Sequence, residues 1–185
     1  MHCKNIFQLC ISIPILACLL FTSCDPNLTS LPESSSDTPE WFDIEMNDVR
    51  TGETFKMNDF AGKVVLVETM AMWCAPCVVQ AGEVQKLYKL LGDSEELVSV
   101  SLDIDLNEEE SALKDYVEEH GFEWRFAIAP IEVARALGNL YGAQFLNPPV
   151  SAMLVIDRNG KAYPLEFGKK SAEVLLETLR PYLEP

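Results

Sequence analysis

The sequence predicts an α/β domain in which helices cover both faces of a β-sheet. Three observations predict it: a nearly continuous apolar strand at 63–69, apolar residues at helical spacing just after it, and alternating strand and helix patterns up to the C-terminus. A strand that is apolar at almost every position is typical of the centre of a sheet. Alternation of strands and helices favours strands joined by helical crossovers.

Each element has its own local signal. A turn at 59–62 precedes the first strand, and apolar residues at helical spacing follow from 78 until Gly92 ends the helix. Arg158-Asn159-Gly160 is a hairpin signal between two short strands. The remaining elements expected, in chain order, are strand 97–104, helix 111–119, strand 124–129, helix 131–141, strands 152–157 and 162–167, and helix 171–183.

Composition and charge limit the classes of function. The chain has 185 residues, 48% of them hydrophobic, which predicts one globular domain with or without a tail. It carries 14 basic and 29 acidic residues, for a formal net charge of −15. A nucleic-acid-binding protein needs a basic surface, so that class is excluded.

The N-terminal segment 1–23 is expected to be a secretory signal peptide. Lys4 precedes a 16-residue apolar run, which is short for a bilayer-spanning helix. The run ends in Leu20-Phe21-Thr22-Ser23-Cys24, which resembles the bacterial lipoprotein box and implies cleavage before Cys24 and lipid on that residue. An uncleaved anchor and plain secretion remain as alternatives, and all three put the domain outside the cytoplasm.

The stretch after the signal peptide is expected to be a spacer. Residues 24–40 begin with Cys24 and are rich in Ser, Pro and acidic residues without an apolar period, which is typical of a flexible linker. The folded domain is therefore expected at 41–185. Lipid on Cys24 would hold this domain at the bacterial cell membrane.

Two of the six cysteines remain for chemistry in the mature domain. Removal of the signal peptide takes three of them, and lipid would occupy Cys24, so Cys74 and Cys77 are left. A bridge between residues so close in sequence closes a tiny loop and removes little chain entropy from the unfolded state. The pair is therefore better suited to opening and closing than to stabilising the fold.

The motif Trp73-Cys74-Ala75-Pro76-Cys77 lies at the junction between the first strand and the following helix. At a helix N-terminus, unpaired N–H groups and the helix dipole stabilise the thiolate of Cys74, which is the nucleophilic form. Cys77, about one turn further on, can attack the mixed disulfide that Cys74 forms. Pro76 fits the first turn, where its missing N–H has no partner.

Residues 51–67 together with this motif resemble the thioredoxin-fold lipoproteins of the TlpA/ResA type within the redoxins, and the resemblance covers about 40–185. It implies a thioredoxin-like fold with an N-terminal hairpin and the activity of a membrane-tethered thiol–disulfide oxidoreductase. Cys74 would attack, Cys77 would resolve, and no separate cofactor would be needed. No metal is expected, because a closed zinc site needs four ligands.

Glu68 is the third candidate catalytic residue. It lies six positions before Cys74, near the end of the apolar strand, where thioredoxin carries a buried Asp. A carboxyl group beneath the dithiol would have a raised pKa and would accept the proton of Cys77. The alternative is a strand-end carboxylate that faces water.

The resemblance also implies that a loop opposite the dithiol, together with Trp73 and Pro76, docks the substrate. Members of the family usually carry a cis-Pro in this loop, but the spacing measured back from Gly160 reaches Ala152 instead. Either Pro149 is the cis residue of a longer loop or the cis-Pro has been lost. Pro149 and Ala152 are both taken as docking candidates.

The expected partners are the thiols and disulfides of other proteins. The resemblance favours a monomeric reductant for c-type cytochromes or copper proteins, although the residues do not fix the direction of electron flow. The main alternative is a Sco-like copper chaperone that binds copper through Cys74 and Cys77, with Met70 and Met72 as soft ligands. A third is a binding module with a vestigial dithiol.

Overall fold

The computed structural model describes residues 38–92 and 94–184, so the predictions for the signal peptide, Cys24 and most of the spacer lie outside the described residues. No helix in this described part is long and apolar enough to cross a membrane.

The strands are β1 Met46–Asn47, β2 Thr54–Phe55, β3 Val64–Met70, β4 Leu97–Asp103, β5 Arg125–Ile128, β6 Met153–Ile156 and β7 Ala162–Pro164. The helices are α1 Ala75–Leu91, α2 Glu110–His120, α3 Ile131–Tyr141 and α4 Ala172–Leu183. Four 3-10 helices complete the list: η1 Glu40–Asp43, η2 Met57–Phe60, η3 Ala143–Leu146 and η4 Pro148–Val150.

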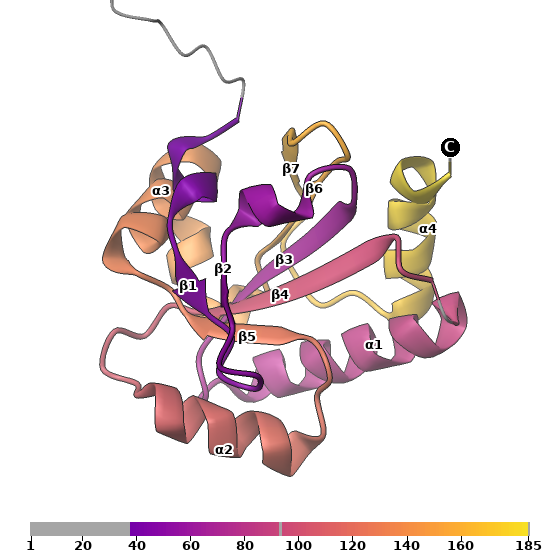
Figure 1. Ribbon diagram of the computed structural model, residues 1–185. Helices are drawn as coiled ribbons and strands as arrows, with labels where there is room; N and C mark the ends of the chain where they lie inside the picture. Colours follow the sequence, from indigo (N-terminus) through magenta and orange to yellow (C-terminus); the bar gives the residue numbers. More distant parts are fainter. Residues whose placement is uncertain (1–37, 93, 185) are drawn as a thin grey trace, which may run out of the picture. The chain divides into compact units, whose positions relative to one another are not determined.

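The main sheet has five strands in the order β5-β4-β3-β6-β7 (Figure 1). Strands β3, β4 and β5 run parallel to one another, whereas β6 is antiparallel to β3 and β7 is antiparallel to β6. The short hairpin of β1 and β2 forms a separate two-stranded sheet. Next to this hairpin, the N–H of Val49 donates to the C=O of Phe126 at 2.9 Å, so the chain covers part of the outer edge of β5.

Strand β3 is the centre of the sheet, and all seven of its residues are buried. Because side chains alternate along a strand, Val64 and Leu66 enter the apolar cluster on one face while Val65 and Val67 enter the cluster on the other. Glu68 continues this alternation on the face of Leu66. The core position that follows Leu66 on this face is therefore a carboxyl group.

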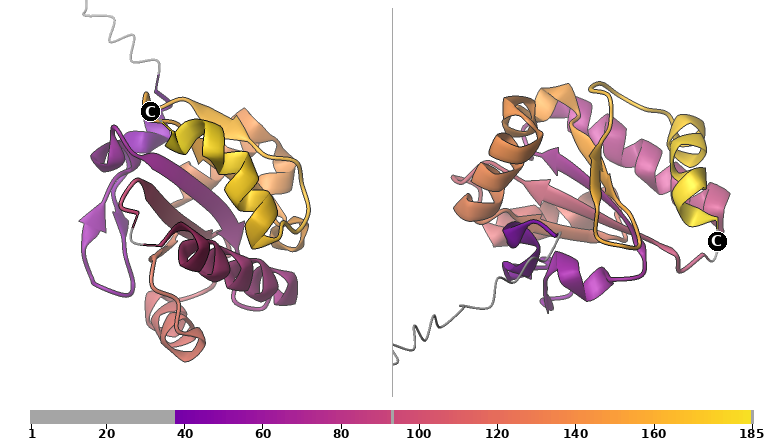
Figure 2. Two further views of the ribbon diagram at one scale, coloured as in Figure 1. Left: turned by 90° about the vertical axis from the view of Figure 1, so that its right-hand side faces the viewer. Right: turned by 90° about the horizontal axis from the view of Figure 1, so that it is seen from above.

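Helices cover both faces, as the strand and helix alternation predicts. The cluster on the Leu66 face takes its helical side chains from α1, α2 and α4, and α1 and α4 lie side by side (Figure 2). The opposite face is covered by α3 and by the N-terminal segment that contains η1 and η2. The predicted α/β fold with an N-terminal hairpin is confirmed.

Helix α1 begins at Ala75, in agreement with the predicted place of Cys74 at its N-terminus and of Pro76 in its first turn. The other predicted strand and helix ends lie within one residue of those observed, with one exception. Strand β7 ends at Pro164, three residues earlier than predicted. The segment between α3 and β6, for which the sequence predicts no element, forms the two short helices η3 and η4.

The burial of Trp41 predicts that the folded domain includes the chain from η1 onward. Trp41 is 1% exposed and packs edge-on against Phe42 and Tyr141. Replacing Trp41 with Ala is expected to lower the free energy of unfolding by about 3–5 kcal/mol, the usual cost of deleting a buried aromatic ring. Urea unfolding measures this change. Leu140→Ala, at a position 57% exposed, is the control and should cost well below 1 kcal/mol.

Candidate active site

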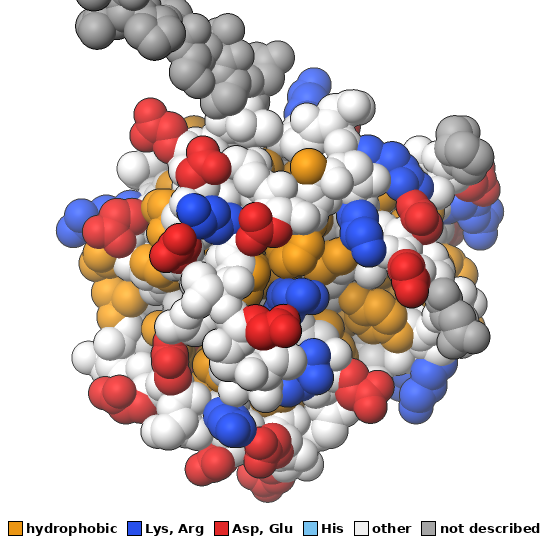
Figure 3. All heavy atoms as spheres, in the orientation of Figure 1, with side chains coloured by type: hydrophobic (Ala, Val, Ile, Leu, Met, Phe, Trp, Pro, Cys, Tyr) orange, Lys and Arg blue, Asp and Glu red, His pale blue; other side chains and the backbone are white. Residues whose placement is uncertain are grey.

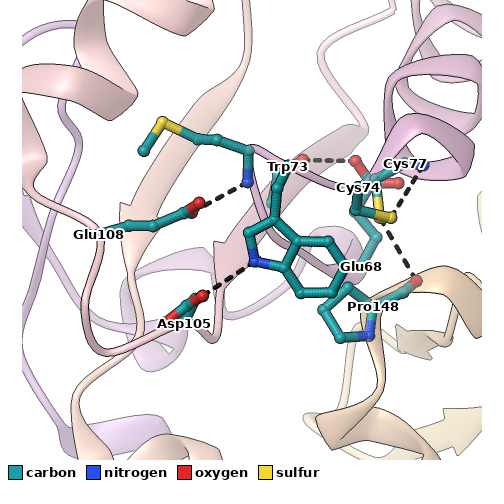
Figure 4. Close-up of a disulfide and its surroundings, with 9 residues drawn as sticks. Glu68, Trp73, Cys74, Cys77, Asp105, Glu108 and Pro148 are labelled. Atoms are coloured by element: carbon teal, nitrogen blue, oxygen red, sulfur yellow. Dashed lines mark hydrogen bonds between the residues drawn. A yellow bond between two sulfur atoms is a disulfide. The ribbon is translucent and has the colours of Figure 1, made fainter.

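A disulfide between Cys74 and Cys77 lies where β3 passes into α1 (Figure 4), with an S–S distance of 2.09 Å. Strand β3 ends at Met70, three residues form the connection, and Cys74 is the N-cap of α1. Its sulfur accepts a hydrogen bond from the backbone N–H of Cys77 at 3.2 Å. A backbone N–H in the first turn of a helix stabilises a sulfur that gains negative charge, so the site favours the thiolate of Cys74.

The two sulfurs have different surroundings. The Cys77 sulfur lies 3.3 Å from the backbone C=O of Pro148 in η4. In the reduced protein this carbonyl can accept the S–H of Cys77, which favours the protonated thiol over the thiolate. Backbone groups therefore favour a thiolate at Cys74 and a thiol at Cys77, the assignment that an attacking and a resolving cysteine require.

Both cysteines are nearly covered, with exposed fractions of 1% for Cys74 and 4% for Cys77. Exposed apolar side chains occur on the neighbouring segments: Trp73 precedes the pair, and Leu146 lies just before η4. Phe167 is also exposed, and the next residue, Gly168, donates its N–H to Val150 at the end of η4. Exposed apolar side chains therefore lie on three segments near the cysteine pair.

Carboxylates after β4 hold the connection that carries Trp73. The Asp105 carboxylate accepts the indole Nε1–H of Trp73 at 2.9 Å, and Glu108 accepts the backbone N–H of Met72 at the same distance (Figure 4). Asp103 lies beneath them and is fully buried. Burial, and then a hydrogen bond with Glu108, raises the pKa of the Asp103 carboxyl far above its ordinary value.

Glu68 is buried at 6% exposure, so the alternative of a strand-end carboxylate facing water is wrong. Its Oε1 accepts a hydrogen bond from the hydroxyl of Ser101 at 2.6 Å. Figure 4 shows Glu68 on the same side of the close-up as the two cysteines. Burial raises the pKa of Glu68 from 4.5 to about 7, although the bond from Ser101 opposes this rise. Near neutral pH the group can both hold and release a proton.

The predicted docking residues have different environments. Pro149 is exposed in η4, whereas Ala152 is fully buried and its C=O accepts the N–H of Thr69 at 3.1 Å. Because its side chain and its carbonyl are both engaged inside the sheet, Ala152 offers a partner no surface. All peptide bonds of the described residues are trans, so Pro149 is not a cis residue.

Four residues of this site were missed by sequence reasoning: Ser101, Asp105, Glu108 and Pro148. A signal existed for Ser101, because Ser99, Ser101 and Asp103 are polar at alternate positions of an otherwise apolar predicted strand. Such a pattern indicates polar groups facing one side of the core. Pro148 acts through its backbone carbonyl, for which side-chain chemistry gives no signal.

One hollow in the described part of the chain lies away from the dithiol. It measures about 660 Å³ and is lined at the C-terminal end of α1 and the start of β4 and β5 by Tyr88, Ser99, Trp124, Arg125 and their neighbours. Figure 3 shows this face, where apolar side chains are exposed between α1 and β4. The cysteines lie at the opposite ends of these elements.

A disulfide at the N-terminus of the helix that follows the central strand of a thioredoxin fold defines a thiol–disulfide oxidoreductase. The redoxin family profile matches residues 32–175, so the chain belongs to the redoxin family. The predictions of fold, family and oxidoreductase activity are thereby confirmed.

Known relatives agree with this assignment. The chain is 25% identical over 125 residues to the thiol-disulfide oxidoreductase ResA of Bacillus thuringiensis (strain Al Hakam), covering 67% of this chain and 66% of the relative. The chain thus spans about two thirds of that relative's length. A thiol:disulfide interchange protein from Chlorobium tepidum TLS superposes with a TM-score of 0.64 at 21% identity, covering 76% of this chain and 93% of that chain. For MTB dsbF the TM-score is 0.62 at 16% identity, covering 80% and 99%. At these identities the solved structures support the fold.

The raised pKa of Glu68 predicts a specific dependence of stability on pH. Between pH 4.5 and about 7 the folded protein binds a proton at Glu68 that the unfolded chain has released, so stability falls as pH rises through this window. Relative to Glu68→Gln, the oxidised wild type should lose roughly 1–3 kcal/mol of unfolding free energy between pH 4.5 and 8. Urea unfolding of both oxidised proteins measures the difference, in which the titration of Asp103 cancels. A constant difference across this range would contradict the assignment.

Proposed function

We propose that the protein reduces or exchanges disulfides of partner proteins outside the cytoplasm, with Cys74 as attacking and Cys77 as resolving cysteine. The observation that carries the assignment of roles is the asymmetry of the two sulfurs. The Cys74 sulfur accepts a backbone N–H at 3.2 Å, whereas the Cys77 sulfur faces a carbonyl oxygen at 3.3 Å. The first contact favours a thiolate and the second favours a thiol.

The reaction proceeds in two exchanges. The Cys74 thiolate attacks one sulfur of the partner disulfide, an S–S bond forms between Cys74 and the partner, and the other partner sulfur leaves as a thiolate. Cys77 then loses its proton and attacks the Cys74 sulfur, which forms the Cys74–Cys77 disulfide and releases the second partner sulfur. The partner gains two electrons and the dithiol loses two. The reverse sequence oxidises a partner dithiol.

Glu68 takes the proton of Cys77 in the second exchange. Its carboxyl group is buried, lies on the sheet face that also packs against Cys77, and has a pKa of about 7. A base works best when its pKa lies near the operating pH. Because the pKa of a thiol is about 8.5, this carboxylate is a competent acceptor at neutral pH.

The substrate class is protein disulfides, with Trp73, Pro76 and Pro149 in the docking surface. Trp73 is 60% exposed and is fixed by its bond to Asp105, so it offers a positioned apolar contact beside the sulfurs. Cytochrome c or copper proteins as targets, and lipid attachment at Cys24, are part of the proposal through the TlpA/ResA resemblance. A solved relative at 13% identity is described as a secreted disulfide oxidoreductase, which agrees with an extracytoplasmic site of action.

The net charge of −15 would attract a basic partner. Acidic and basic side chains are interspersed over the face in Figure 3. The copper-chaperone alternative has no specific observation in its favour. Met70 is 2% exposed inside the apolar cluster and Met72 packs against the same cluster, which is ordinary core packing.

Replacing the resolving cysteine is expected to trap the intermediate. Reduced Cys77→Ser should accumulate a mixed disulfide between Cys74 and a disulfide-containing test protein such as insulin, because the second exchange cannot occur. Non-reducing electrophoresis and mass analysis measure the adduct. Cys74→Ser is the matched control and should give little adduct, because the Cys77 sulfur lacks the N–H contact that favours a thiolate. Equal trapping by both variants would reverse or abolish the assigned roles.

The reduction potential of the purified protein distinguishes the two directions of electron flow. We expect a value near that of thioredoxin, about −270 mV, because a reductant must be strongly reducing. Equilibration with glutathione or dithiothreitol buffers, followed by thiol alkylation, measures it. A value near that of the strong oxidant DsbA, about −120 mV, would mean that the protein inserts disulfides instead.

A further inference from the structure

Two residues outside the predicted site form a buried chain of hydrogen bonds that ends on Glu68. The indole Nε1–H of Trp124 donates to the hydroxyl oxygen of Ser101 at 2.9 Å, and that hydroxyl lies 2.6 Å from Glu68 Oε1. Trp124 is 6% exposed and Ser101 is fully buried. Glu68 comes from β3, Ser101 from β4 and Trp124 from the position just before β5, and the register of the sheet pairs Glu68 directly with Ser101.

The chemistry of the groups gives the chain a direction. An indole N–H only donates, so it occupies a lone pair of the Ser101 oxygen and leaves the single hydroxyl proton free to point at Glu68. A hydroxyl that donates to a carboxylate forms a charge-assisted bond, for which 2.5–2.7 Å is the usual O···O distance. The observed distance lies in this range. The chain therefore stabilises the ionised form of Glu68 against the penalty of burial.

We infer that Ser101, oriented by Trp124, is a positioning residue that sets the pH range in which Glu68 exchanges a proton with the dithiol. This inference rests on the proposed function, because it requires Glu68 to be the proton acceptor of Cys77. Without the hydroxyl, Glu68 would lose this hydrogen bond inside the core, and the hollow beside it, lined by Leu66, Val84, Ser99 and Met153 among others, has no room for a water molecule to replace it. Glu68 would then keep its proton to higher pH and would accept the proton of Cys77 less readily.

Other ionisable groups also face Glu68 and must be separated from it. Asp103 lies on the same face of β4, Tyr116 comes from α2, Glu108 comes from the connection between them, and Cys74 and Cys77 come from α1. Burial raises the pKa of Tyr116 to about 12, far from the neutral range. Measurements repeated with Glu68→Gln identify the part of any pH dependence that comes from these other ionisable groups.

The chain contains a matched control for the hydroxyl. Ser99 lies two residues before Ser101 on the same strand and the same face, and it is 3% exposed. In the described part of the chain, Ser101 donates a hydrogen bond to Glu68 and Ser99 does not. Ser99→Ala therefore removes an equally buried hydroxyl from the same part of the core without removing the bond to Glu68.

Two measurements on the full chain test the inference. In the oxidised protein, whose cysteines do not titrate, NMR of the side-chain carboxyl carbons follows the ionisation of Glu68. In the reduced protein, the rate of insulin reduction is measured from pH 5 to 9.5. Ser101→Ala should raise both the Glu68 pKa and the matching inflection of the rate profile by about one to two pH units. Ser101→Thr, which keeps the hydroxyl, should restore both, and Ser99→Ala should leave both unchanged.

The outcomes separate this inference from the proposed function. The role of Ser101 would be overturned if Ser101→Ala and Ser99→Ala shifted the Glu68 pKa equally. It would also be overturned if Ser101→Ala still shifted the rate profile in a protein that carries Glu68→Gln. A second outcome concerns the proposed function itself. If Ser101→Ala moves the Glu68 pKa measured by NMR, but Glu68→Gln removes no inflection from the rate profile, then Glu68 is not the proton acceptor and the proposed function fails on that point. Trp124→Phe should raise the Glu68 pKa by less than Ser101→Ala, because Ser101 keeps its own bond.

Discussion

The complete burial of β3 is the constraint on which the other features of the protein depend. Strand β3 pairs with β4 on one side and with β6 on the other, and both of its faces are covered. Four residues separate its end from the first residue of helix α1. A rigid strand therefore fixes the start of this helix, and with it the backbone N–H that faces the Cys74 sulfur. The reactivity of the cysteine pair follows from this placement, since neither cysteine carries unusual chemistry of its own.

The same burial makes Glu68 a functional group. A carboxyl group in the core costs folding free energy when it is ionised, and its pKa rises as a result. The sheet reduces this cost by the single hydroxyl of Ser101, which is itself held by Trp124. A partly compensated buried acid has a pKa near neutrality, whereas a fully exposed or fully uncompensated one would not. The burial that lowers stability when Glu68 is ionised is the same burial that gives this carboxyl group the raised pKa required by its proposed role as proton acceptor of the dithiol.

The surroundings of the disulfide divide into a buried side, where we propose that protons are exchanged, and an exposed side, where we propose that partners dock. Glu68, Ser101 and Trp124 lie in the core on the sheet side, out of reach of a partner. Trp73 and Pro149 are exposed on the other side, where Asp105 fixes the indole of Trp73. Carboxylates occur on both sides with different roles. Asp105 and Glu108 accept N–H groups and order the connection that carries Trp73, whereas Glu68 titrates in the neutral range.

The sequence by itself determined the α/β class, the central strand and the redox motif, because each depends on local patterns of apolar residues or on a short motif. For Glu68 the sequence left burial and a water-facing strand end as alternatives, and the structure decided for burial. Tertiary structure alone decided that Ser101 reaches Glu68, that the Pro148 carbonyl faces Cys77, and that Ala152 is enclosed in the sheet. These contacts join residues 33 and 71 positions apart in the chain, and one of them uses a backbone atom that every residue has. Strand register and loop path decide such contacts, and neither leaves a signature in the local order of side chains.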